Sequence, residues 1–115
     1  MDTLAPLSYE DFAKVDIRLG KVVRVEDFPR AKKPAYRVWV DFGPSIGVLQ
    51  TSAQVTVNDT HETLLGKKVL GCVNLGEKNI AGFVSQFLLL GVTDENGNVC
   101  LATVSHDALL GAKLH

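Results

Sequence analysis

Basic side chains gather in one short loop of this chain. Arg30, Lys32 and Lys33 lie between Pro29 and Pro34, in the segment 27–34. Guanidinium and ammonium groups bind phosphate oxygens through charge-assisted hydrogen bonds. The loop is therefore a candidate site for a polyanion such as RNA. The alternative interpretation is a charged, solvent-exposed turn and strand face that bind no ligand.

The excess of positive charge extends along the segment that contains this loop. Seven basic and three acidic residues lie between positions 16 and 40: Arg18, Lys21, Arg24, Arg30, Lys32, Lys33 and Arg37, against Asp16, Glu26 and Asp27. The whole chain has a formal net charge of −1. A general affinity for nucleic acid usually accompanies a net basic chain, so any such site must be local.

Other candidate ligand-binding residues lie near the ends of the predicted strands. Phe28, at the root of the basic loop, either stacks on a base, holds an apolar peptide side chain, or anchors the loop on the protein. Lys78 and Asn79 fall in a second loop. Ser52, Gln54, Ser85 and Gln86 offer neutral hydrogen bonds to sugar, base edges or a peptide backbone.

The sequence contains no recognisable catalytic, metal or cofactor motif. His61, His106 and His115 are scattered and lack a second ligand at metal spacing. Neither Ser52 nor Ser85 has the G-x-S-x-G context of a hydrolase nucleophile. We therefore predict a non-catalytic protein without a metal or cofactor. The two cysteines, Cys72 and Cys100, are predicted to be buried thiols because each lies in an apolar run.

Length and composition indicate one folded domain. The chain has 115 residues, 46% of them hydrophobic and 22% charged, which is typical of a globular protein. The segment 1–8 resembles no secretory signal, and the longest apolar run, Phe87–Val92, is too short to cross a bilayer. We expect no membrane insertion and a cytoplasmic location.

Residue periodicity predicts short strands and short helices. A helix is expected over residues 8–14 with Ser8 as its N-cap. Apolar residues at every second position predict a strand over 15–26, in which Gly20 allows a bend or bulge. Further strands are predicted over 35–42 and 46–51.

The second half is predicted to add one helix and more strands. Thr60 caps a helix that ends near Leu65. A strand follows over 67–75, then a loop over 76–82, a strand over 83–92 that is buried on both faces, and a strand over 99–104 after a hairpin turn. Ser105 is expected to cap a last helical turn through Leu110.

This order of elements predicts the fold class. A five-stranded all-β barrel with a short helix between its third and fourth strands is the OB-fold arrangement. Such barrels bind ligands through the loop after the first strand and the loop after the fourth strand. Here these loops are the segments 27–34 and 76–82, which contain the basic candidates.

Several separated motifs carry a resemblance to a known family. The opening DFAKVDIRLGKVV resembles that of CsaA-type proteins, which belong to the wider family of tRNA-binding OB domains. The similarity continues in the right order through Glu26–Tyr36, Val40–Gly43, Ile46–Gly47, Thr51–Thr56, Ile80–Phe83 and Ser85–Gly91.

The resemblance implies several properties beyond the fold. It implies a single tRNA-binding domain over residues 1–115, with a barrel over about 15–92. It implies a homodimer formed through the helix at 8–14 and the extension at 93–115. It implies binding of tRNA, and a proposed chaperone role with unfolded polypeptides in protein export.

The chain departs from the family pattern near the expected binding face. Glu77-Lys78-Asn79 stands where relatives are often basic, and Leu49 and Val84 stand where they often have Lys. These changes make the face less positive and more apolar, which favours polypeptide binding somewhat. A module that only assembles with other proteins is the alternative to both ligands.

Overall fold

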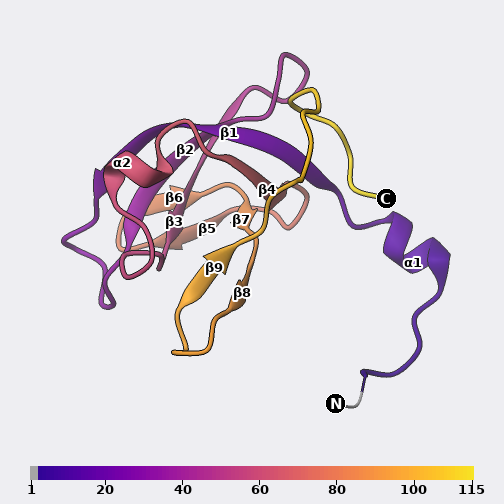
Figure 1. Cartoon of the computed structure of the whole chain (residues 1–115), viewed down its shortest axis with the longest axis horizontal. Coiled ribbons are helices and arrows are strands. Elements are labelled where there is room, and N and C mark those ends of the chain that lie inside the picture. The colour runs from indigo at the N-terminus through magenta and orange to yellow at the C-terminus, as the bar shows by residue number, and fades with distance from the viewer. Residues whose placement is uncertain (1–2) are drawn as a thin grey trace.

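The main sheet of the molecule has five antiparallel strands, in the order β3-β2-β1-β4-β7. A computed structural model describes residues 3–115 (Figure 1). In chain order the elements are α1 (Tyr9–Ala13), β1 (Ile17–Asp27), β2 (Tyr36–Asp41), β3 (Val48–Ala53), α2 (His61–Leu64), β4 (Lys68–Cys72), β5 (Lys78–Ile80), β6 (Phe83–Ser85), β7 (Leu88–Leu89), β8 (Gly91–Thr93) and β9 (Val99–Leu101). The curved sheet with α2 between β3 and β4 confirms the predicted all-β, OB-type barrel.

Strand β1 belongs to both halves of the barrel. Its first half, Ile17–Lys21, pairs with β4, and its second half, from Lys21 to Asp27, pairs with β2. A bulge between Val22 and Arg24 lets one strand change partners in this way. The bulge therefore does not lie at Gly20, where the sequence predicted a bend or bulge.

Gly20 has a packing role instead. A Cβ atom on this residue would lie 2.3 Å from Val40 Cγ1 and 2.9 Å from the Phe42 ring. Both neighbours are fully buried. Only a residue without a side chain lets β1 approach the core this closely.

The barrel closes between β3 and the segment 84–87 mainly through side chains. The Gln50 N–H donates to Gln86 Oε1 at 3.1 Å, and the Gln86 N–H donates to the Gln50 carbonyl at 2.8 Å. The buried Thr51 hydroxyl donates to the Phe87 carbonyl at 2.7 Å. We call this contact the seam. It satisfies edge groups of β3 that a continuous strand ladder would otherwise pair.

Alternate residues of the strands fill the core. Val38, Val40 and Phe42 point inward from β2 and its end, and Val22 and Val69 reach the same cluster from β1 and β4. Leu64 from α2 and Phe87 from the seam cover its ends. These positions follow the period of two that the sequence shows.

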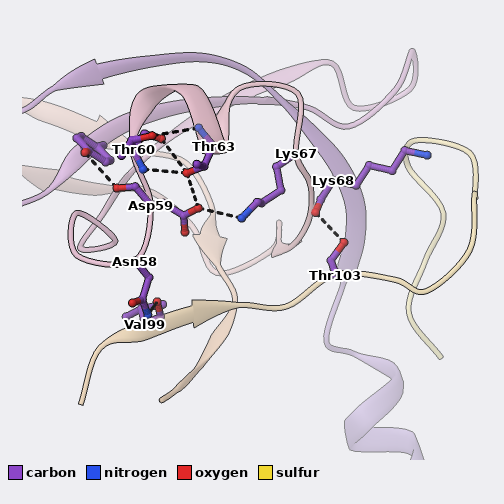
Figure 2. A network of polar contacts seen from close by, with 9 residues as sticks. Asn58, Asp59, Thr60, Thr63, Lys67, Lys68, Val99 and Thr103 are labelled. Carbon is purple, nitrogen blue, oxygen red and sulfur yellow. Dashed lines mark hydrogen bonds and ion pairs between the residues drawn. The ribbon is translucent and has the colours of Figure 1, made fainter. Parts of the chain in front are cut away.

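The helix starts predicted at Ser8 and Thr60 are confirmed. The Ser8 hydroxyl accepts a hydrogen bond from the Asp11 N–H, and Thr60 forms a capping box with Thr63. The buried carboxylate of Asp59 links α2 to the segment after it. Asp59 Oδ1 accepts hydrogen bonds from the Thr63 hydroxyl and Lys67 Nζ, both at 2.9 Å (Figure 2). This network was not predicted from the sequence.

The predicted strand over 83–92 is wrong. The segment is divided into β6, β7 and β8, and Leu88 and Val92 are more than half exposed. Only Phe87 in this run is buried, because the chain turns here from the seam to β4 and then out into the β8–β9 hairpin.

The predicted loop over 76–82 is also wrong. Its second part forms β5, which pairs with β6 as a hairpin. Ala81 and Gly82 connect the strands with positive φ angles of 50° and 85°. Two consecutive positive φ angles make the type I′ turn that matches the twist of a two-residue hairpin.

The segment 105–115 contains no helix, so the predicted helical turn from Ser105 to Leu110 is wrong. The chain instead runs beside the start of β1, where the Gly111 N–H donates to the Leu19 carbonyl and the Leu114 N–H to the Ile17 carbonyl. Backbone pairing with β1 thus replaces the predicted helical bonds.

Two further predictions concern single residues and the membrane. Cys72 is buried as predicted, whereas Cys100 is exposed because β9 turns it away from the barrel, so that prediction is wrong. None of the helices described for residues 3–115 has the length and apolar character that crossing a membrane requires.

Candidate nucleic-acid interface

A groove of about 740 Å³ lies between the basic loop and the β8–β9 hairpin. We call it the basic groove. One wall is the loop after β1, with Arg30, Lys32 and Lys33. All three side chains are exposed. The loop leads directly into β2, the neighbour of β3, and it lines the groove together with residues at the end of β3.

The opposite wall of the basic groove is apolar. Leu88 and Leu89 from β7, and Val99 and Leu101 from β9, contribute it. Val99 and Leu101 are two positions apart in β9, so their side chains lie on the same face of the β8–β9 hairpin. This wall was not predicted from the sequence, because the apolar run 83–92 is typical of a single buried strand.

Neutral polar residues lie between the two walls. Ser52 and Gln54 come from the end of β3, and Asn79 comes from β5. The Asn79 side chain accepts a hydrogen bond from the Gly82 N–H at 2.9 Å, which fixes the β5–β6 turn beside the groove. These groups can donate to or accept from a ligand without adding charge.

The electrostatics of the groove are one-sided. None of the residues that line it is acidic. Within residues 3–115, Arg30, Lys32 and Lys33 form no ion pair, whereas Arg18, Arg24 and Arg37 are each paired with a carboxylate. Of the seven basic residues in the segment, only the three in the groove wall and Lys21 therefore form no ion pair with the residues that the structure describes.

The structure brings together six of the ten predicted site residues. These are Arg30, Lys32, Lys33, Ser52, Gln54 and Asn79. Lys78 lies exposed on β5, opposite Ser85, and does not line the groove.

The other three predicted residues have structural contacts. Ser85 and Gln86 belong to the seam, where the Ser85 hydroxyl accepts from the Ser52 N–H at 3.1 Å. Phe28 is only 6% exposed and packs edge-on against Phe83 at 5.5 Å. Phe28 thus occupies the position of a loop anchor, one of the three alternatives for this residue.

One tether that the sequence did not indicate holds the apolar wall in place. Asn58 Nδ2 donates to Asp94 Oδ2 at 2.8 Å and to the Val99 carbonyl at 2.9 Å. The Asn58 amide, followed by the backbone N–H of Asn98, lowers the pKa of Asp94 below its ordinary value. Asn58 therefore couples the loop before α2 to the hairpin.

The described residues do not form a metal centre. In the range 3–115, no three His, Cys, Asp or Glu side chains gather as they would around a metal ion. The chemistry that the groove offers is electrostatic attraction, hydrogen bonding and apolar contact.

Comparison with solved structures shows close likeness along the whole chain. The CsaA chaperone protein from Picrophilus torridus superposes with a TM-score of 0.90 at 40% identity, covering 96% of this chain and 100% of that one. The CsaA chaperone from Bacillus anthracis str. Ames gives 0.90 at 38% identity with the same coverage.

Sequence comparison gives a second group of relatives. A methionine–tRNA ligase of Pyrococcus horikoshii is 38% identical over 108 residues, which is 94% of this chain and 14% of the ligase. The chain thus spans about one seventh of the ligases that it matches. A family model described as "Putative tRNA binding domain" matches residues 17–113. Since this match covers most of the chain, the protein belongs to the tRNA-binding domain family, a family of binding domains and not of enzymes.

Proposed function

We propose that this protein binds tRNA in the basic groove. The observation that carries the proposal is the wall of three cations without a facing carboxylate. Arg30, Lys32 and Lys33 neutralise phosphates, and the release of counterions from the RNA drives binding. Ser52, Gln54 and Asn79 donate to or accept from sugar and base edges in the groove.

Charge reversal in the groove tests this function. Arg30→Glu with Lys33→Glu should abolish binding of labelled tRNA in a fluorescence anisotropy titration. The control is Lys14→Glu with Lys21→Glu, which makes the same change of charge at exposed residues that do not line the groove. Equal loss in both double variants would show that the groove is not the site.

The second candidate ligand is an unfolded polypeptide, as in a chaperone that acts in protein export. The apolar wall favours it, because Leu88, Leu89, Val99 and Leu101 offer contact to apolar side chains. Two structures with which the chain shares its fold are described as CsaA chaperones. The dependence of affinity on salt concentration distinguishes the two ligands, because RNA binding weakens as salt rises while apolar contact persists or strengthens.

We further propose that the protein acts as a homodimer in the cytoplasm. The N-terminal helix α1 stands away from the barrel (Figure 1). Leu7 before α1, Tyr9 at its first position and Leu109 in the segment after β9 are exposed by 66%, 77% and 86%. Apolar side chains at this level of exposure favour a second copy of the chain. Light scattering coupled to gel filtration should give twice the mass of the monomer.

The same titrations test the alternative role of a module that only assembles with other proteins. A protein that binds neither tRNA nor unfolded polypeptide, yet copurifies with a stable different subunit, would have that role.

A further inference from the structure

Three aromatic rings and two guanidinium groups form a row outside the basic groove. Phe83 contacts Phe28 and Trp39 edge to face, with ring centroids 5.5 Å and 5.8 Å away. The Arg24 guanidinium carbon lies 4.4 Å from the Trp39 ring centre, and that of Arg37 lies 5.7 Å from Phe28 and 6.0 Å from Phe83. We call these five residues the aromatic row.

The row lies on the outer face of the sheet. Val38 and Val40 in β2 are completely buried in the core. Because side chains alternate along a strand, Arg37 and Trp39 point to the opposite face. Arg24 is the register partner of Trp39 in β1, so its side chain meets the ring across the strand pair.

Both guanidinium groups are held by polar contacts as well as by rings. Arg37 donates from Nε to the Asp27 carbonyl at 3.0 Å, and its Nη2 lies 3.2 Å from Glu26 Oε1. Arg24 pairs with Glu26 Oε2. A guanidinium with one face on a ring and its edge on a carboxylate is fixed before a ligand arrives.

The outer faces of these groups are open to a ligand. The Arg24 side chain is 59% exposed and the Arg37 side chain 34%. The planes of arginine guanidinium groups are surfaces on which unpaired RNA bases stack. Two arginines share the single carboxylate of Glu26, so the row keeps a positive charge that attracts phosphate.

The row is continuous with the basic groove. A second cavity, of about 210 Å³, is lined by Phe28, Phe83 and Arg37 of the row. Arg30 and Ala81 line this cavity and the basic groove alike. These two residues thus form a ridge, and the exposed Arg30 can hold a phosphate where a chain passes from one cavity to the other.

We propose that the aromatic row binds unpaired nucleotides of the RNA whose phosphates occupy the basic groove. Bases stack on the guanidinium planes of Arg24 and Arg37, and the backbone crosses the ridge at Arg30. This inference rests on the proposed RNA-binding function, and it specifies the ligand as an RNA that combines a duplex with a single-stranded segment. A blunt duplex reaches only the groove.

The test compares two labelled RNA hairpins of the same stem. One is blunt, and the other carries a single overhang of about four unpaired nucleotides, at its 5′ or its 3′ end. This length is the smallest site size of a single OB domain. The overhang should tighten binding by at least about fivefold, because stacking of a single base already contributes that much. It should also change the emission of Trp39, the only tryptophan, more than the blunt hairpin does at saturation.

A pair of conservative variants separates stacking from charge. Arg24→Lys keeps the charge but removes one of the two planes, so it should reduce the overhang advantage by about the fivefold that one stacked base contributes. Lys21→Arg is the matched control, because it is an equally conservative exchange at an exposed residue of β1 that lines neither cavity, and it should leave both affinities and their ratio intact. Thermal unfolding of both variants checks that each is folded.

The outcomes distinguish this inference from the function on which it rests. If both hairpins bind with equal affinity, or if Arg24→Lys retains the advantage, the inference is overturned while RNA binding in the groove stands. If neither hairpin nor tRNA binds at low salt, the proposed function itself fails and the inference with it. A polypeptide that competes with the overhang for Trp39 would overturn the assignment to nucleotides.

Discussion

Gln50 and Gln86 close the barrel by exchanging hydrogen bonds across a gap that no strand ladder covers. The Gln50 N–H donates to the side chain of Gln86, and the Gln86 N–H donates to the Gln50 carbonyl. Gln50 Nε2 also donates to the Val84 carbonyl at 2.9 Å. The seam lies directly beside the groove, because Ser52 belongs to both.

Removal of the Gln86 side chain should destabilise the barrel. Gln86→Ala leaves the Gln50 N–H without its acceptor in a half-buried position, which costs about 1–2 kcal/mol. Gln54→Ala is the control, because Gln54 is exposed and its side chain makes no hydrogen bond within residues 3–115; it should change stability by less than about 0.5 kcal/mol. Urea unfolding measures both, and equal stability of the two variants would contradict a structural role of the seam.

The two lysine–aspartate pairs near β4 should differ in their contribution to stability. The Asp59 side chain is 6% exposed and pairs with Lys67, whereas that of Asp107 is fully exposed and pairs with Lys68. Asp59→Ala also deprives the Thr63 hydroxyl of the nearer of its two acceptors, and it should cost roughly 1–3 kcal/mol.

Asp107→Ala is the matched control for that prediction. An exposed pair contributes between about 0 and 1 kcal/mol. Thermal unfolding of both variants at the same pH checks the difference. A loss at Asp107 as large as that at Asp59 would contradict the account of the network in Figure 2.

The stability of the fold should depend on pH through Asp94, whose partner Asn58 also holds the apolar wall at Val99. Hydrogen bonds from Asn58 and then from the Asn98 N–H lower the pKa of this carboxyl group. A lowered pKa in the folded state stabilises the fold above the pKa of the unfolded chain. This stabilisation disappears as the pH falls through the folded value.

Asn58→Ala tests that coupling. NMR titration should show the pKa of Asp94 closer to its ordinary value in the variant than in the parent. The difference in unfolding free energy between the two proteins should shrink as the pH falls through the lowered pKa of the parent. An Asp94 that titrates at the same pH in both proteins would refute the tether.

A side chain at position 20 should strain the core. In Gly20→Ala, the new Cβ would approach Val40 and Phe42, neither of which has free space. Overpacking of this kind costs about 1–3 kcal/mol. Denaturant unfolding measures the loss, and a variant of unchanged stability would show that β1 can move away from the core.

The fold was predictable where local pattern and final environment agree. Strands β1 and β2 alternate apolar and polar residues because each has one face on the core, and their predicted bounds differ by at most two residues from those observed. The run 83–92 misled prediction because its apolar residues lie on different surfaces: Phe87 is in the core, Leu88 lines the groove, and Leu89 contacts both. Composition cannot separate these roles.

The site was predictable for charge and not for geometry. The basic loop was found because lysine and arginine between prolines form a local signal. The aromatic row was missed because Arg24, Trp39 and Phe83 meet only through the register of β1 with β2 and the path of the seam. Ser85 and Gln86 were predicted to bind a ligand because the sequence of a strand end does not show whether its polar side chains face a ligand or another strand.

In the proposed function, Arg30, Lys32 and Lys33 bind phosphates of tRNA in the basic groove. The most direct measurement is the slope of the logarithm of the tRNA affinity against the logarithm of salt concentration, for the parent, Arg30→Gln and Lys33→Gln. Each neutralised cation should weaken binding and reduce the magnitude of the slope by about one. Slopes and affinities that match those of the parent would contradict the claim, and would place the RNA elsewhere on the protein.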